Sequence, residues 1–390
     1  MDEALAQNLT AWRRHLHAHP GLTLHEGETA AFVAARLREL GVEVTEGVGG
    51  HGLVGTIRRA KGEGSNRSVG LRGDMDALPI QEVNPDLPHR STVSGVMHAC
   101  GHDGHTTALL GAAALLVRDK GWAGTVQLVF QPAEEGGGGA RAMIADGLFA
   151  RFPMERIFGW HNWPGLEAGT VAVHERAVMA AGARFEITFE GHAGHAALPH
   201  LTRDPMLGAG HCIVALQSIV ARNVDPMQAG VVSVTVAEAG SAQNQIASRA
   251  VLKGTARWLS DETGEAIESG MRRVADGIAA AFGLRAEVEF CVGVPVTATH
   301  PAERDLAAVA AGAVTNVRRD LTAAMTGEDF SWFLHEVPGA FVWIGNGPTN
   351  RMGGEGGCEL HNPNYDFNDA ILPAASGFLA EVAKRALAGG

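Results

Sequence analysis

The densest group of metal-binding residue types lies at residues 97–105, with the sequence MHACGHDGH. It holds one thiol, three imidazoles and a carboxylate within nine positions, and cysteine and histidine suit borderline-soft divalent metals. Cys100 and His102 lie two positions apart, so an extended segment would point both side chains the same way. Gly101 between them permits close backbone approach. Because the chain contains 18 histidines, a loop with chance histidines is the alternative interpretation.

A pair of adjacent carboxylates, Glu134 and Glu135, follows the apolar run Val126–Phe130 and precedes four glycines. Ligands of α/β sheets bind beyond the carboxyl ends of the strands, which makes this pair a candidate for chemistry. Adjacent residues of an extended chain face opposite sides, so one glutamate would bind metal while the other acts on a water. A solvated acidic pair at the end of a strand is the alternative.

Three further signals are weak when each is taken alone. His161 directly follows the expected strand Ile157–Trp160, which places its imidazole at the same sheet edge as the glutamate pair. His361 lies in a polar segment near the C-terminus. Asp74 and Asp76 follow another expected strand, where they would either bind metal or hold the imidazoles of metal-binding histidines. An ordinary acidic turn is the other interpretation of this pair.

Alternating strands and helices are expected to position these residues. Residues 5–40 predict two helices separated around His19–Gly21, since helical apolar spacing is interrupted by proline and glycine. Further along, the predicted elements are the strands Leu53–Ile57, Val69–Arg72, Val126–Phe130, Ile157–Trp160 and Gly339–Ile344, and the helices Thr106–Val117 and Glu303–Val314. This alternation predicts an α/β sheet with helices on both faces.

The pattern changes near residue 184. From there the order is strand, helix, strand, strand, helix, strand, which is typical of a self-contained α+β unit. The predicted elements are Phe185–Phe189, Pro205–Arg222, Val231–Glu238, Ala250–Trp258, Glu262–Ala281 and Ala286–Phe290. We therefore expect a small domain at 184–296, inserted into a larger discontinuous domain formed by 1–183 and 297–390.

Composition excludes several classes of protein. The 390 residues predict more than one domain, and 46% hydrophobic and 19% charged residues are ordinary for a globular protein. A net charge of -12 without a basic patch argues against a nucleic-acid partner. No stretch approaches a membrane span and the first residues do not form a signal peptide. Four scattered cysteines without a CxxC pair favour a reducing, cytoplasmic setting.

Taken together, seven motifs resemble one family. In chain order they are RRHLHAHPGL, RGDMDALP, MHACGHDGH, FQPAEE, FGWHNWPG, GHAGHAALPH and GEDFS. They resemble the bacterial amidohydrolases that include hippurate hydrolase and the plant hydrolases of indole-acetyl amino acids, within the aminoacylase/carboxypeptidase metallohydrolase family. The similarity runs from about residue 10 to about residue 385. CGHD followed by PAEE at this spacing is highly specific.

The resemblance implies an α/β fold, in which a zinc-peptidase-like catalytic domain with a mixed sheet carries an inserted ferredoxin-like α+β domain for dimerisation. It also implies two divalent metal ions per subunit, zinc or manganese, with nickel or cobalt as further options. Cys100 matches a bridging thiolate, Glu134 the general base, and Asp76 a supporting acid. The remaining metal ligands match His102, Glu135, His161 and His361.

In the inserted domain, the resemblance implies roles for three residues. His195 matches a histidine that reaches the active site of the partner subunit and steadies the oxyanion, although His192 could be confused with it. Asn244 and Arg257 match contacts to the carboxylate or acyl oxygen of the substrate, and a strand-face salt bridge is the alternative for Arg257. The sequence reads Asn-Gln-Ile-Ala at 244–247, where related sequences commonly read Asn-Val-Ile-Pro, so the turn differs beside this substrate contact.

The expected activity is metal-dependent hydrolysis of the amide bond of N-acyl amino acids, such as hippurate or N-acetyl amino acids, by a homodimer. Its partner is a small molecule, with neither nucleic acid nor membrane involved. Three alternatives stay open: a metal-dependent carboxypeptidase or dipeptidase, a cysteine hydrolase with Cys100 as its nucleophile, and an inactive metal-binding homologue.

Overall fold

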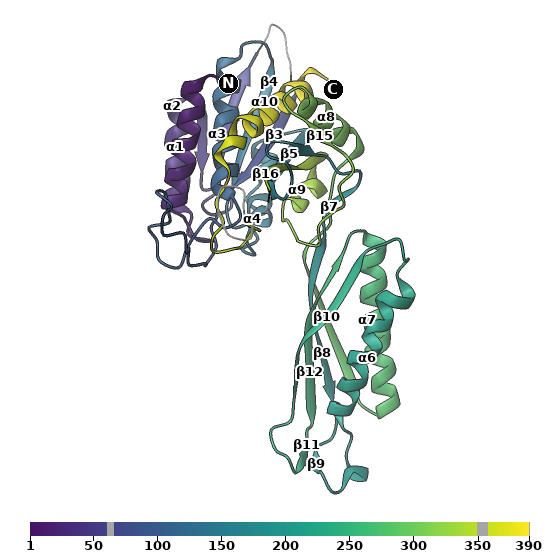
Figure 1. The fold of residues 1–390 in the computed structure, drawn as a ribbon. Helices are drawn as coiled ribbons and strands as arrows, with labels where there is room; N and C mark the ends of the chain where they lie inside the picture. The colour runs from purple at the N-terminus through teal and green to yellow at the C-terminus, as the bar shows by residue number, and fades with distance from the viewer. Residues whose placement is uncertain (61–65, 349–357, 390) are drawn as a thin grey trace. The chain divides into compact units, whose positions relative to one another are not determined.

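The computed structural model describes residues 1–60, 66–348 and 358–389, and the chain divides into two compact units. Unit 1 consists of Met1–Val178, Ala298–Thr322 and Asp329–Gly390. Unit 2 consists of Met179–Thr297 and Ala323–Glu328. Each unit has its own sheet (Figure 1).

Unit 1 is built on an eight-stranded sheet of order β1-β2-β4-β3-β5-β16-β6-β15. Its strands are β1 (Glu43–Glu46), β2 (Leu53–Arg59), β3 (Ser68–Asp74), β4 (Gly124–Gln131), β5 (Arg156–Pro164), β6 (Val171–Ala172), β15 (Val317–Arg318) and β16 (Gly339–Gly347). The central strands β4, β3, β5 and β16 are parallel, whereas β1 and β2 are antiparallel to their neighbours. The predicted α/β fold with a mixed sheet flanked by helices is confirmed.

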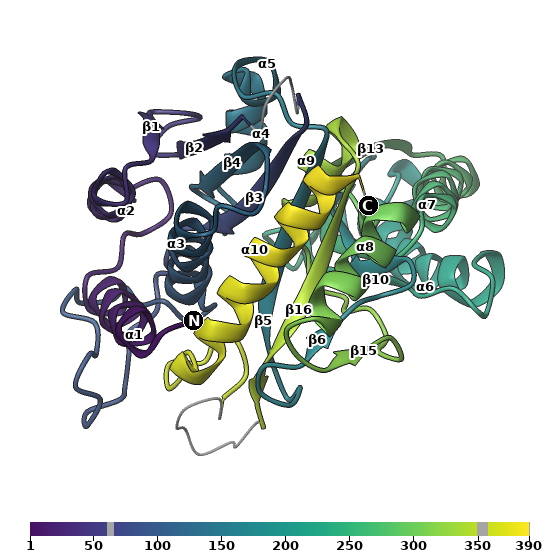
Figure 2. The ribbon, with the colours of Figure 1, turned by 90° about the horizontal axis from the view of Figure 1, so that it is seen from above.

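Helices cover this sheet. They are α1 (Glu3–Ala18), α2 (Gly27–Glu39), α3 (His102–Arg118), α4 (Gly139–Ala145), α5 (Leu148–Arg151), α8 (Pro301–Gly312), α9 (Ser331–Glu336) and α10 (Leu372–Ala388). Figure 2 shows α3 and α10 side by side across the sheet. Gly111 permits this approach, because a Cβ atom there would lie 2.2 Å from Oγ of Ser376 in α10.

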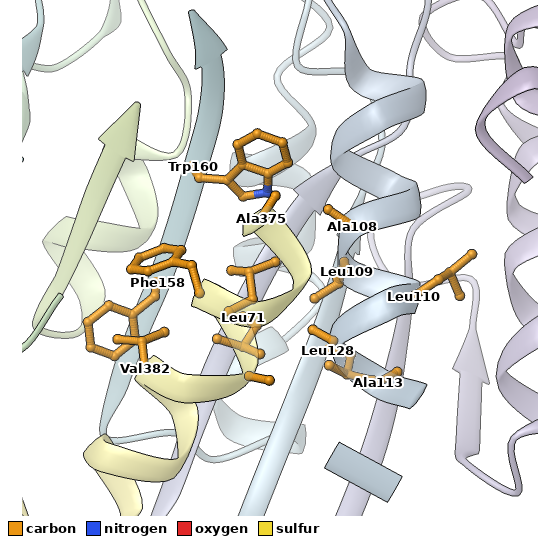
Figure 3. Packing of buried hydrophobic residues seen from close by; sticks show 14 of the residues in the cluster. Leu71, Ala108, Leu109, Leu110, Ala113, Leu128, Phe158, Trp160, Ala375 and Val382 are labelled. Atoms are coloured by element: carbon orange, nitrogen blue, oxygen red, sulfur yellow. The ribbon is translucent and has the colours of Figure 1, made fainter. Parts of the chain in front are cut away.

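The core of unit 1 lies between these two helices and the sheet. α3 is apolar on almost every side, as expected of a helix buried all round. In Figure 3, Leu109 of α3 and Val382 of α10 lie over Leu71 and Phe158 of the central strands. This packing fixes the start of α3 relative to the carboxyl ends of β3 and β5.

Unit 2 contains the predicted strand–helix–strand–strand–helix–strand order. Its elements are β8 (Ala181–Glu190), α6 (Pro205–Asn223), β10 (Gly230–Ala239), β12 (Arg249–Trp258), α7 (Asp261–Phe282) and β13 (Arg285–Val294). They form an antiparallel sheet of order β10-β12-β8-β13. In β8, Phe185, Ile187 and Phe189 are buried while Arg184 and Glu190 are exposed, the alternation of a sheet with one face in the core.

Several short elements have no predicted counterpart, because two or three residues carry too little periodicity. They are β7 (Ala177–Met179), β9 (Gly194–His195), β11 (Gln245–Ile246), β14 (Thr297–Ala298) and the 3-10 turns Pro199–Leu201 and Asp369–Ile371. Among the described residues, no helix has both the length and the apolar character needed to cross a membrane.

Candidate metal centre

The candidate residues of unit 1 gather at one edge of the sheet. Asp74 is the last residue of β3, the glutamate pair follows β4, and His161 lies near the end of β5. Since these three strands are parallel, their carboxyl ends meet at the edge where α/β proteins bind ligands. α3 begins at His102.

Two local expectations from the sequence are wrong. The segment Cys100–His102 is not extended, because Gly101 has a left-handed φ of 89° and precedes the first residue of α3. Glu134 and Glu135 lie in a turn instead of an extended segment, and an oxygen of each lies within 4.8 Å of the other and of a His102 nitrogen. In addition, His161 lies within β5 and not after it, because pairing with β16 continues as far as Pro164.

Hydrogen bonds fix the tautomers of two imidazoles. Nδ1 of His102 lies 2.9 Å from the carbonyl oxygen of Asp76, and Nδ1 of His161 lies 2.7 Å from that of Asn162. A carbonyl only accepts, so both Nδ1 atoms carry hydrogen, and Nε2 is the nitrogen of each ring that can bind a metal once it is unprotonated. Nε2 of His161 lies 3.4 Å from Sγ of Cys100, and the buried Nε2 of His102 has no hydrogen bond. This is the arrangement of metal-binding histidines, whose other nitrogen is held by an acceptor.

Asp76 connects two of the candidate ligands. Its Oδ1 lies 3.3 Å from Nδ1 of His102, and its Oδ2 accepts the Glu135 amide hydrogen at 2.9 Å and the Thr23 hydroxyl hydrogen at 2.8 Å. His361, far along the chain, reaches the same place, with Nε2 3.3 Å from Oε1 of Glu135. Asp76 is therefore placed to orient ligands.

The potential ligand atoms form two triads that share one residue. Cys100 groups with His102 and His161, and again with Glu135 and His361, with all ligand atoms of a triad within 4.8 Å of one another. Oxygen, nitrogen and sulfur donors of this mixture suit zinc and neighbouring divalent metals. Glu134 groups with His102 and Glu135, and its Oε1 accepts the Asp329 amide hydrogen at 3.4 Å. The donor set fits two divalent cations.

The electrostatics of the site also favour bound cations. Burial raises the pKa of the Cys100 thiol well above its ordinary value, and Glu135 and Glu134 raise it further. Burial lowers the pKa of His102, but Asp74, Asp76 and Glu135 outweigh this effect and raise that pKa to about 10. The carboxylates that contribute to both shifts place negative charge beside the ligand atoms, which a bound divalent cation would neutralise as the thiol loses its proton.

The other two histidines of MHACGHDGH do not group with Cys100, although His105 groups with Asp74 and His102. Nε2 of His105 accepts the Asn162 amide hydrogen at 3.0 Å, so its Nδ1 carries hydrogen and donates to Oδ1 of Asp74 at 2.6 Å. His98 is buried, which lowers its pKa to about 4, and neither ring nitrogen has a hydrogen-bond partner. Only His102 of these three imidazoles belongs to a triad with Cys100.

Sequence reasoning missed two residues of the site. The Asn162 side chain donates to the Cys100 carbonyl at 2.6 Å, and the Tyr365 hydroxyl donates to Oδ1 of Asn162 at 2.5 Å. The chain has a single tyrosine, and it is fully buried four positions after His361. A lone tyrosine four positions after a candidate ligand was the sequence signal that could have identified Tyr365. For Asn162, the only such signal was its position next to His161.

Unit 2 separates its three candidate residues. His195 pairs with Gln245 between β9 and β11, and the Asn244 carbonyl accepts the Ala196 amide hydrogen at 2.9 Å, so His195 and Asn244 are neighbours. β9 and β11 lie at one end of the long strands (Figure 1), where Arg249 pairs with Glu190.

Arg257 lies at the other end of β12. It pairs with Gly182, and a Cβ atom on that glycine would lie 2.4 Å from the Arg257 guanidinium. Eight residues at about 3.3 Å each separate Arg257 from the Arg249 end, a span of roughly 26 Å.

The sheet, its carboxyl-edge ligand set and the acidic pair define a zinc-peptidase-like metallohydrolase. Comparison with known families agrees: the model of peptidase family M20/M25/M40 matches residues 70–385. The chain belongs to this family, and the resemblance seen in its motifs is confirmed. It is an enzyme, a metal-dependent amidohydrolase.

The chain is similar to characterised relatives over nearly its whole length. It is 39% identical to hippurate hydrolase of Campylobacter jejuni, covering 96% of this chain and 95% of that protein. It is 38% identical to N-acetyl-L-cysteine deacetylase of Bacillus subtilis, covering 98% and 89%. Among solved structures, a dinuclear metal-binding peptidase of the M20 family from Bacillus subtilis is 35% identical, with a TM-score of 0.88 and all of both chains covered.

Proposed function

We propose that this enzyme hydrolyses the amide bond of N-acyl amino acids at a centre that binds two divalent ions. Cys100 would contribute its thiolate to both ions. His102 and His161 would hold one ion with it, and Glu135 and His361 would hold the other. The two triads that meet at Cys100 are the observation that carries this proposal. Zinc or manganese fits the donor set, and so do nickel and cobalt.

Glu134 is the general base. When bound, the ions supply a more acidic water and positive charge for the carbonyl oxygen. Glu134 takes a proton from the attacking water, whose oxygen bonds to the amide carbon. It then delivers this proton to the nitrogen as the carbon–nitrogen bond breaks, which leaves a carboxylic acid and a free amino acid. Positioned proton transfer of this kind contributes about 10²–10⁴ in rate.

Substrate recognition requires residues from two copies of the chain. Arg257 binds the substrate carboxylate, for which a guanidinium fork is suited, while His195 and Asn244 contact the acyl oxygen. A span of roughly 26 Å along one rigid strand is far longer than an N-acyl amino acid. One substrate therefore cannot touch Arg257 and His195 of the same unit 2, which supports a homodimer in which unit 2 is the dimerisation domain.

The names of the relatives support the substrate class. Hippurate and N-acetyl-L-cysteine, which two relatives are named for, are both N-acyl amino acids. The cytoplasm is the proposed compartment, supported by four cysteines that form no disulfide among the described residues.

A cysteine hydrolase is the second candidate, because His161 lies next to Cys100. The site disfavours it: reactive thiolates need an electropositive, accessible environment, whereas Cys100 is buried beside carboxylates that raise its pKa. Treatment with a strong chelator separates the two. A metal-dependent enzyme loses activity and regains it with added zinc or manganese, while a cysteine hydrolase stays active.

A substrate panel with matched variants tests the proposal. Benzoyl-glycine, N-acetyl amino acids and dipeptides are each assayed with each metal, using wild type, Glu134→Gln and Cys100→Ala. We expect Glu134→Gln to keep its metal and to lose turnover. If it retained most of its activity, the assignment of Glu134 as the base would be wrong. If wild type hydrolysed only the dipeptides, the enzyme would be a dipeptidase and not a hydrolase of N-acyl amino acids.

A further inference from the structure

The side chain of Asn162 joins two segments that carry candidate ligands. It follows His161 in β5, it is fully buried, and its Nδ2 donates to the Cys100 carbonyl at 2.6 Å. The same Nδ2 lies 3.1 Å from Nε2 of His105. The single lone pair of that Nε2 atom accepts the Asn162 backbone amide hydrogen at 3.0 Å, so the bond to the Cys100 carbonyl is the main hydrogen bond of Nδ2.

The orientation of the amide is fixed from its other side. The Tyr365 hydroxyl donates to Oδ1 of Asn162 at 2.5 Å, and a flipped amide would turn Oδ1 toward the Cys100 carbonyl, one acceptor against another. The Asn162 backbone amide hydrogen also donates to Nε2 of His105, whose Nδ1 is held by Asp74. Because Nδ2 donates to the Cys100 carbonyl and Oδ1 accepts from Tyr365, Asn162 holds the backbone and does not bind metal.

The backbone beside Cys100 is shaped for this contact. A Cβ atom on Gly101 would lie 2.3 Å from Nδ2 of Asn162 and 2.9 Å from the Tyr365 hydroxyl. Gly101 also has a φ of 89°, which glycine adopts without strain. The close approach of Asn162 and the left-handed turn therefore depend on the same glycine.

From these contacts we propose that Asn162 is a positioning residue that sets the distance between the Cys100 thiol and the His161 imidazole. The two ligands lie on separate segments, and their Sγ and Nε2 atoms are 3.4 Å apart. A metal centre tolerates displacements of only about 0.5 Å. The hydrogen bond from Nδ2 of Asn162 to the Cys100 carbonyl connects these two segments directly. The inference rests on the proposed function, since it takes both residues as ligands.

Cobalt(II) substitution provides the test. A thiolate bound to cobalt gives a charge-transfer absorption band, and competition with a chelating dye gives the affinity for metal. Asn162→Ala is expected to weaken metal binding about 10–100-fold, the usual cost of losing a group that orients a ligand, and to shift or weaken the cobalt–thiolate band. The KM for benzoyl-glycine should change little, because Asn162 does not contact substrate.

A matched control is the buried Asn346 near the end of the neighbouring strand β16. Its Oδ1 accepts the Asn368 amide hydrogen at 3.0 Å and holds that loop, not Cys100. Asn346→Ala should lower the unfolding temperature but keep metal affinity within about twofold of wild type and leave the band unchanged. A general loss of packing would affect both variants alike.

Tyr365→Phe keeps the fold testable if Asn162→Ala does not fold. It removes only the hydroxyl that orients the amide, and we expect a loss of metal affinity of threefold or more. The inference would be overturned if Asn162→Ala kept wild-type metal affinity and an unaltered cobalt–thiolate band. If only Tyr365→Phe folds, the same result in that variant would overturn it. Cys100→Ala separates failure of the proposed function from failure of this inference. If that variant kept the cobalt–thiolate band, the assignment of Cys100 as a ligand would be wrong.

Discussion

Replacing His17 should remove a large, pH-dependent part of the stability of unit 1. His17 lies in α1 and is fully buried, with Nδ1 2.7 Å from Oδ2 of Asp103 and Nε2 3.4 Å from Oε1 of Glu82. Burial lowers the pKa of His17, but the hydrogen bonds to Asp103 and Glu82 outweigh it and raise that pKa from 6.5 to about 9. The pair holds the N-terminal helix against the start of α3.

The size of the effect follows from this shift. A pKa raised from 6.5 to about 9 corresponds to roughly 3 kcal/mol, at about 1.36 kcal/mol per pH unit. Because the pKa is higher in the folded state, the folded protein binds the proton more tightly than the unfolded chain. The stabilisation is therefore complete below pH 6.5, declines as pH rises, and is lost above about pH 9.

Chemical denaturation of the metal-free protein, with chelator and reductant present, measures this directly. Six of the seven tryptophans lie in unit 1, so a Trp258→Phe background makes fluorescence report unit 1 alone. The difference in unfolding free energy between this background and His17→Gln should be about 3 kcal/mol larger at pH 6 than at pH 9.5. His102, whose pKa is also raised, is present in both proteins and cancels. A difference that does not change with pH would refute the reasoning.

Three more predictions concern the site. Gly101→Ala should lower stability by at least the roughly 1–2 kcal/mol of a left-handed non-glycine residue and weaken metal binding, as seen by thermal unfolding and dye competition; unchanged values would contradict the close approach. Asp76→Asn should lower metal affinity about 10–100-fold by loosening His102, measured by the same competition, and wild-type affinity would remove its supporting role. Arg257→Ala should lower kcat/KM about 10–150-fold, the equivalent of a charge-assisted hydrogen bond of roughly 1.5–3 kcal/mol. That loss should vanish with an amidated substrate lacking the carboxylate, and an equal loss with both substrates would contradict the contact.

Much of the fold was predictable because its apolar runs are long. The alternation in Phe185–Phe189 and the run Val126–Phe130 predicted strands that the structure contains as parts of β8 and β4. Strand ends were less predictable. The predicted strand Ile157–Trp160 extends to Pro164, because backbone pairing with β16 continues through His161 and Asn162. The polar side chains of these two residues give no local sign of a strand.

The hydrogen bonds by which Asn162 and Tyr365 connect the ligand-bearing segments were not predictable from local sequence pattern. Tyr365 and Asn162 are 203 positions apart, and no periodicity connects them. Gly101 was correctly expected to permit close approach, but its left-handed turn was missed, since composition does not distinguish an extended glycine from one that precedes a helix.

Metal content tests the central claim most directly. Wild type, Glu134→Gln and Cys100→Ala are loaded with zinc, passed through gel filtration and analysed for metal per chain. Because Cys100 belongs to both triads, the account predicts two ions in wild type and in the inactive Glu134→Gln, and fewer than one in Cys100→Ala. A Cys100→Ala protein that retained two ions would contradict the shared thiolate.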